Sequence, residues 1–233
     1  MIANSCGLSE AFNRIVSECY PVKEARTKIR CAEFLSEYCQ KKRIGISLAD
    51  ENFFTDYFIK WLPYQICRES PEIIKALYPS ADEYVRLTDM LNGGSVYKRF
   101  CKMTPEVRQE SERLLMLKRS IMEYNNSFIL SKMPFVADFD LYKLKRPNSE
   151  ITDRDRGRFR VESIFSKNSV VLSRINGYEY YIRLYFNSDI ISLISENDIF
   201  DINVVRSEGS GRWILEDING CLGGKSFSYG RRS

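Results

Sequence analysis

The chain has 233 residues, of which 44% are apolar and 28% charged, with a net charge of +4 and no histidine. The apolar content is enough to build a hydrophobic core and excludes a largely disordered chain. The absence of histidine excludes Ser-His-Asp and Cys-His catalysis and histidine-based zinc or iron sites, whereas carboxylate, lysine and thiolate chemistry stay open.

The spacing of apolar residues changes once along the chain, near Gly157. Before this point apolar residues recur every three or four positions, as on amphipathic helices, and after it they alternate or form short β-branched and aromatic blocks. The pattern predicts an α+β protein, with an N-terminal all-helical domain followed by a small antiparallel β-barrel, SH3-like or OB-like. The expected parts are a helical domain at 1–145, a linker at 146–156, the barrel at 157–222 and a flexible basic tail at 223–233.

The first helices are expected over residues 10–20 and 23–41, where apolar side chains fall on one stripe. Asp50 is expected to cap a third helix, because an aspartate just before an amphipathic helix accepts hydrogen bonds from the free backbone amides of its first turn. This helix has a dense aromatic face and is expected to kink or end at Pro63.

Three further helix starts carry capping residues. Ser70 and Thr104 each precede a proline, and Ser80 begins a Ser-x-x-Glu capping box. The helix that starts at Ser80 is expected to end at Gly93. The helix after Thr104 has apolar residues at a seven-residue spacing, which we interpret as an internal packing face rather than a dimer seam.

Short strands are predicted in the remaining part of the chain. The dipeptide Asn176-Gly177 between two apolar blocks is a strong signal for a β-hairpin. Residues 138–144 fit either a short strand or an extended link. The predicted strands are 159–165, 169–175, 178–186, 190–194, 199–205 and 213–218.

The first candidate binding site is a series of arginines with a period of two. Side chains two residues apart in a strand lie on the same side, so this series would form a positive row suited to phosphates. The alternative interpretation is a solvated edge strand, whose charge is reduced by the intervening Asp153 and Asp155. The four arginines are Arg154, Arg156, Arg158 and Arg160.

The second candidate is the aromatic and basic surface of the predicted hairpin. Aromatic rings beside arginine stack the bases of single-stranded nucleic acids in OB-type barrels. The alternative is cross-strand aromatic pairing, which stabilises sheets by itself. The residues are Arg174, Tyr178, Tyr180, Tyr181, Arg183 and Tyr185. A third basic segment, Lys225 with Arg231 and Arg232, lies in the predicted tail.

Acidic residues cluster late in the chain, and paired carboxylates can bind a metal or divide acid and base roles. A turn followed by solvated strand ends explains them better, so no metal site is expected. They are Glu196, Asp198, Asp201, Glu216 and Asp217.

The seven cysteines are odd in number and contain no C-x-x-C pair. The first residues show no signal peptide, so free thiols in a reducing cytoplasm are expected. Cys221 is expected near an exposed glycine-rich end. No apolar run approaches the ~18 residues of a membrane span, so no membrane partner is expected.

The segment at residues 32–66, AEFLSEYCQKKRIGISLADENFFTDYFIKWLPYQI, is similar in its helical spacing to the core-binding domain of tyrosine recombinases. The catalytic half of that family needs histidine, and here a β domain is expected instead. The resemblance therefore carries over no site residue, and we assign no family.

Two hypotheses for function follow. The first is a non-enzymatic nucleic-acid-binding protein that uses the basic and aromatic face of the barrel, and the second is an interaction or scaffold module that binds a peptide or partner domain. An enzyme ranks third because no catalytic motif is recognisable, and no cofactor is expected. Residues 141–233 hold three of the four net positive charges, which favours the first hypothesis. Its predicted contacts are Arg154, Arg156, Arg158, Arg160, Arg174, Arg183, Tyr181 and Tyr185.

Overall fold

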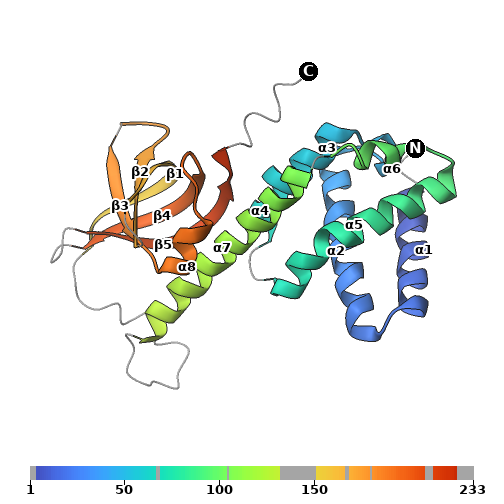
Figure 1. Ribbon diagram of the computed structural model, residues 1–233, viewed down its shortest axis with the longest axis horizontal. Coiled ribbons are helices and arrows are strands. Elements are labelled where there is room, and N and C mark those ends of the chain that lie inside the picture. The colour runs from blue at the N-terminus through green and yellow to red at the C-terminus, as the bar shows by residue number, and fades with distance from the viewer. Residues whose placement is uncertain are drawn as a thin grey trace. The chain divides into compact units, whose positions relative to one another are not determined.

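The structure is a computed structural model, and it describes residues 4–66, 69–103, 105–131, 151–165, 168–178, 180–207 and 212–224. The chain divides into two compact units, and the boundary falls between Met116 and Leu117. The first unit is helical and the second contains a five-stranded antiparallel sheet, so the protein is mixed α+β as predicted (Figure 1). The predicted extended segment at 138–144 and the basic residues of the predicted tail lie outside the described residues.

The first unit consists of helices joined by short connections. A 3-10 turn, η1, precedes α3, and a π-helical turn, η2, joins α3 to α4. The boundary between the units falls within the longest helix, α7. The elements are α1 (Asn4–Cys19), α2 (Val22–Lys42), η1 (Ile46–Leu48), α3 (Glu51–Asp56), η2 (Tyr57–Trp61), α4 (Leu62–Gln65), α5 (Pro71–Asn92), α6 (Val96–Phe100) and α7 (Pro105–Ser131).

The predicted helix caps at Asp50 and Ser70 are confirmed. The carboxylate of Asp50 accepts a hydrogen bond from the backbone amide of Phe53 at 2.7 Å. The hydroxyl of Ser70 accepts one from the backbone amide of Ile73 at 3.4 Å. Gly93 ends α5 with a φ of 61°, a left-handed conformation that glycine adopts without steric cost.

The predicted helix start at Ser80 is wrong, because α5 continues through Pro79 without interruption. Ser80 and Ala81 are fully buried and continue the inward stripe of Leu77 and Tyr84. Burial of this stripe outweighs the backbone hydrogen bond that Pro79 removes, so a capping sequence stands inside a helix.

Aromatic side chains dominate the core of the first unit. Phe54 and Phe100 meet edge to face, with ring centroids 5.0 Å apart. Tyr57 and Trp61, both within the π-helical turn, stack at 5.7 Å. The predicted aromatic face before Pro63 therefore packs inward, and the chain continues as α4 beyond that proline.

The second unit is built on an antiparallel sheet with the order β3-β2-β1-β4-β5. The long strand β1 pairs with both β2 and β4, and a short helix, α8, follows β3. The first strand begins at Ile151, inside the interval predicted as a linker. The elements are β1 (Ile151–Phe165), β2 (Ser169–Arg174), β3 (Tyr181–Tyr185), α8 (Ser188–Leu193), β4 (Ile199–Ser207) and β5 (Trp213–Leu222).

The strand predicted at 190–194 is wrong, because this segment forms α8 and its C-cap. The side chain of Asn187 caps the helix by accepting a hydrogen bond from the backbone amide of Ile190 at 2.9 Å. Ile190 and Ile194 are both buried and lie four residues apart, which is the helical rather than the strand period.

The expected barrel is an open sheet, since β3 and β5 are edge strands that do not pair with each other in the described part of the chain. Side chains bridge these two edges. The rings of Tyr180 and Trp213 have centroids 6.1 Å apart, and the guanidinium of Arg212 lies 5.7 Å from the ring centroid of Tyr185.

The inner face of the sheet forms the core of the second unit. The half of α7 that begins at Leu117 also belongs to this unit. Lys118 is 1% exposed, and its Nζ donates to the backbone carbonyl of Asn219 at 2.9 Å. The buried strand residues include Phe159, Val161, Val170, Leu172, Ile182, Leu184, Phe200, Ile202, Val204 and Ile218.

No helix in the described ranges is both long enough and apolar enough to cross a membrane.

Candidate functional site

The four predicted arginines of β1 lie on the outer face of the sheet. Phe159 and Val161 are fully buried on the inner face, and the arginines occupy the alternating positions, where each is exposed. The period of two in the sequence therefore becomes a single row along one strand.

The strand register places three residues of β3 on the same face as this row. Arg160 is opposite Ser173 of β2, and Ser173 is opposite Tyr181 of β3. Because paired residues of antiparallel strands lie on the same side of a sheet, alternate residues of β2 and β3 complete this face. We call the combined surface the basic–aromatic strip: Arg154, Arg156, Arg158 and Arg160 of β1, Ser169, Val171 and Ser173 of β2, and Tyr181, Arg183 and Tyr185 of β3.

The remaining predicted contact, Arg174, lies apart from the strip. It is opposite Phe159 in the register, and its guanidinium lies 5.2 Å from the Phe159 ring centroid. Its Nη1 atom is 2.8 Å from a carboxylate oxygen of Asp155, and its Nε donates to the backbone carbonyl of Asn176 at 2.9 Å. The structure thus places Arg174 in a half-buried ion pair at the inner side of the sheet.

Tyr180 completes this inner cluster by donating a hydrogen bond from its hydroxyl to Asp155. Burial, followed by the hydrogen bond to Asp155, raises the pKa of Tyr180 above its ordinary value. Asp155 is therefore shared by Arg174 and Tyr180 and contributes to internal structure rather than to the strip.

Two arginines of the strip have carboxylates nearby. Arg154 lies 3.9 Å from Glu216, and Arg158 lies 3.9 Å from Asp201. These arginine side chains are 62% and 53% exposed, so each contact contributes little stability and leaves the guanidinium accessible to solvent.

The other arginines of the strip lie opposite neutral residues. Arg156 is opposite Asn203, and Arg160 lies between Ser173 and Ile199. Across the described ranges, neither of them nor Arg183 forms an ion pair with a carboxylate. The carboxylate of Glu162 accepts a hydrogen bond from the hydroxyl of Ser173, the residue opposite Arg160. The positive charge of the strip is thus least compensated at Arg156 and Arg183.

The tyrosines of the strip are accessible, with Tyr181 60% and Tyr185 44% exposed. Two further residues near them were not predicted from the sequence. The Arg183 guanidinium lies 5.1 Å from the ring centroid of Phe165, and Arg212 lies over Tyr185. No sequence signal identifies Phe165 or Arg212, because only the folded sheet brings strand ends together with β3.

The acidic residues do not form a metal site in the part of the chain that the structure describes. Asp198 is fully buried in a turn, where its carboxylate accepts hydrogen bonds from the backbone amides of Ser195 at 2.9 Å and Gly224 at 3.2 Å. Asp201 instead lies on the outer face of β4 beside Arg158. The turn interpretation accounts for Asp198.

Three of the cysteines are buried, and one of them, Cys221, was expected near an exposed end. Burial raises the pKa of Cys31 to about 11 and that of Cys39 to about 12, so both thiols are protonated at neutral pH. Cys221, expected near an exposed end, is fully buried on β5. Cys31 and Cys39 therefore lack the lowered pKa of a reactive cysteine, and all three thiols lack its exposure.

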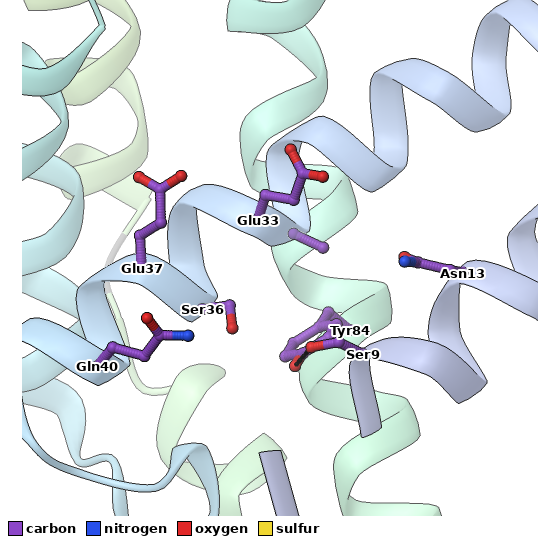
Figure 2. A pocket seen from close by; sticks show the side chains of 8 residues that line it. Ser9, Asn13, Glu33, Ser36, Glu37, Gln40 and Tyr84 are labelled. Carbon is purple, nitrogen blue, oxygen red and sulfur yellow. Dashed lines mark hydrogen bonds between the residues drawn. The ribbon is translucent and has the colours of Figure 1, made fainter. Parts of the chain in front are cut away.

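A polar pocket of about 280 Å³ lies in the first unit, between α1, α2 and α5. Figure 2 shows the side chains that line it, including the carboxylates of α2. Arg30 lies 3.1 Å from Glu33 and 3.8 Å from Glu37, so these carboxylates are already partly compensated. The residues that line the pocket and are labelled in Figure 2 are Ser9, Asn13, Glu33, Ser36, Glu37, Gln40 and Tyr84.

Comparison with known proteins found no matching family model, no matching curated protein and no matching solved structure.

Proposed function

We propose that the protein is a non-enzymatic nucleic-acid-binding protein and that the basic–aromatic strip of its second unit is the binding surface. The observation that supports this most strongly is the register of β1, β2 and β3, which joins two separate sequence patterns on one exposed face. Guanidinium groups bind phosphates, and exposed aromatic rings stack with bases, so the two patterns complement both parts of a nucleotide.

The topology supports the OB-like alternative of the two barrel types expected from the sequence. An OB-fold is a five-stranded, partly open barrel in which β2 and β3 carry the ligand face. In this sheet β1 is shared by β2 and β4, and α8 lies between β3 and β4 in the chain. Strands β3 and β5 run in the same direction, since each is two antiparallel steps from β1.

Binding is tested by fluorescence anisotropy with labelled oligonucleotides at low and at physiological salt. If three to five arginines contact phosphates, the logarithm of the affinity falls with the logarithm of salt concentration with a slope of about −2 to −4. The double variant Arg156→Glu with Arg160→Glu is expected to abolish binding, because it reverses two charges of the strip that form no ion pair among the described residues.

A matched control makes the same change in net charge at two residues of the first unit, outside the strip. Arg26→Glu with Lys75→Glu alters two exposed residues of the helical unit. This control is expected to bind nearly as tightly as the native protein. The proposal is wrong if the native protein binds no oligonucleotide at low salt, or if both double variants lose the same affinity. Absence of binding would favour the alternative of an interaction module for a peptide or partner domain.

A further inference from the structure

We infer that the basic–aromatic strip takes an unpaired strand rather than a duplex, with bases stacked on Tyr181 and Tyr185. This inference rests on the proposed function and specifies the chemistry of its ligand. Three features of the strip carry it: the partners of the two rings across the sheet, the distance between the rings, and the width of the positive surface.

The two tyrosines are not engaged in the aromatic pairing that stabilises many sheets. Tyr181 is opposite Ser173 and Tyr185 is opposite Ser169, so neither ring has an aromatic side chain opposite it on β2. No aromatic partner of either ring is found among the described residues. Cross-strand packing on β2 therefore does not explain two tyrosines at these positions, whereas a stacking ligand would.

The distance between the rings suits an unstacked strand. Tyr181 and Tyr185 are four residues apart on the same face of β3, which corresponds to about 13 Å along the strand. Bases in a duplex are stacked about 3.4 Å apart along each strand, and neighbouring bases cover both of their faces. Only a strand with separated bases can place one base on each ring.

The positive surface is also narrow. It spans β1, β2 and β3, two strand spacings or about 10 Å. On the β4 and β5 side the outer face carries carboxylates, including Asp201, Glu216 and Asp217. The second strand of a duplex would bring its phosphates toward these carboxylates, whereas a single strand can follow the arginine row and β3.

Arg212 contributes to the same subsite. Its guanidinium lies over the ring of Tyr185, at the place where a base would stack. Base stacking on an aromatic ring is stronger than an exposed cation–π contact, so the base is expected to displace Arg212 from the ring. We expect the displaced guanidinium to contact the adjoining phosphate, so that Arg212 becomes a second contact of the same nucleotide.

The test compares three probes on the full chain. These are a labelled single-stranded DNA of about 20 nucleotides, an RNA of the same sequence and the corresponding blunt DNA duplex, each at low and at physiological salt. We expect at least one single strand to bind at least about tenfold more tightly than the duplex at physiological salt. Tyr181→Leu and Tyr185→Leu are each expected to weaken that binding by about 5- to 100-fold.

Two variants serve as controls for folding and for ring chemistry. Leu48→Ala shortens an apolar side chain that is 76% exposed in the first unit, outside the strip, and is expected to leave affinity unchanged. Tyr181→Phe retains the ring and is expected to retain most of the affinity, whereas loss equal to that of Tyr181→Leu would contradict stacking.

The outcomes separate this inference from the proposed function. Equal or tighter binding of the duplex, sensitive to Arg156 and Arg160 but not to the tyrosines, overturns the inference and leaves nucleic-acid binding intact. Failure of all three probes to bind at low salt overturns both.

Discussion

The guanidinium of Arg174 occupies the space directly beside Gly157, so that a Cβ atom at residue 157 would lie 2.6 Å from the Cζ atom of Arg174. Asp155, two residues before this glycine on β1, forms an ion pair with Arg174 and accepts a hydrogen bond from the hydroxyl of Tyr180. Gly157 was recognised in the sequence as the place where the apolar spacing changes. Its structural role is to leave room for a half-buried arginine on the inner face.

Gly157→Ala is expected to destabilise the second unit by about 1–3 kcal/mol, because the new methyl group displaces Arg174 from Asp155. Urea unfolding followed by Trp213 fluorescence in a Trp61→Phe background measures this change. Gly45→Ala is the control, since a Cβ there comes no closer than 3.8 Å to any neighbour and is expected to change stability by less than about 1 kcal/mol.

A double-mutant cycle tests the stated cause. In an Arg174→Ala background the cost of Gly157→Ala should shrink by at least about 0.5 kcal/mol, because the group that clashes with the methyl is absent. An undiminished cost in that background would show that the glycine is required for another reason.

The buried thiols predict an alkaline loss of stability in the first unit. Their folded pKa values of about 11 for Cys31 and about 12 for Cys39 exceed the unfolded value of 9.0, so the folded state binds more protons above pH 9. The free energy of unfolding is therefore expected to be insensitive to these groups below about pH 9 and to fall as pH rises toward 12.

Urea midpoints measured across this pH range check the prediction. In the variant Cys31→Ala with Cys39→Ala, the free energy of unfolding should fall less steeply as pH rises above 9. Part of the fall should remain, because burial also raises the pKa of Tyr57. An unchanged slope in the double variant would mean that the thiols do not contribute. Both thiols should also resist aromatic disulfide reagents at pH 8 until the unit unfolds.

The cap of α3 predicts a local effect on the helical unit. Asp50→Ala removes the hydrogen bond to the Phe53 amide and is expected to cost about 1 kcal/mol, whereas Asp50→Asn should recover most of the loss. Thermal unfolding followed by circular dichroism measures both variants. Equal stability of the alanine and asparagine variants would contradict a capping role.

Asp201→Asn is expected to tighten nucleic-acid binding by about 2- to 10-fold at low salt, because it removes a negative charge 3.9 Å from Arg158. The hydrogen bond from the Asn219 side-chain amide, 3.0 Å in the native protein, can persist to the new amide oxygen. Asp189→Asn makes the same charge change on exposed α8, outside the strip, and should alter affinity much less. Weaker binding of Asp201→Asn would argue against phosphate contact at Arg158.

Part of the candidate site follows from the sequence alone. The period of two across Arg154 to Arg160 predicts one exposed row, and the structure confirms that these side chains share a face. The alternation on β3 likewise puts Tyr181, Arg183 and Tyr185 together. Nothing in the sequence shows that these two faces are the same, because that depends on which residues of β1, β2 and β3 are paired.

Two differences between the sequence prediction and the structure have a common physical cause. Proximity in the sequence groups Arg174 with Tyr181 and Arg183, yet its register opposite Phe159 puts it on the inner side of the sheet. Residues 190–194 have strand-like composition but form a helix, since the Asn187 cap and two buried isoleucines satisfy a helical segment. In both cases a contact made by folding outweighed a local preference.

What the sequence determines by itself is the division into helical and stranded parts, most helix ends, and the common face of the four arginines of β1. These features depend on contacts between residues a few positions apart, and the order of residues alone specifies such contacts. The tertiary structure decided the strand order, the open edge between β3 and β5, the serines opposite the exposed tyrosines and the position of Arg212 over Tyr185. These depend on the pairing of distant segments, whose registers are selected by burial of the whole inner face rather than by local spacing.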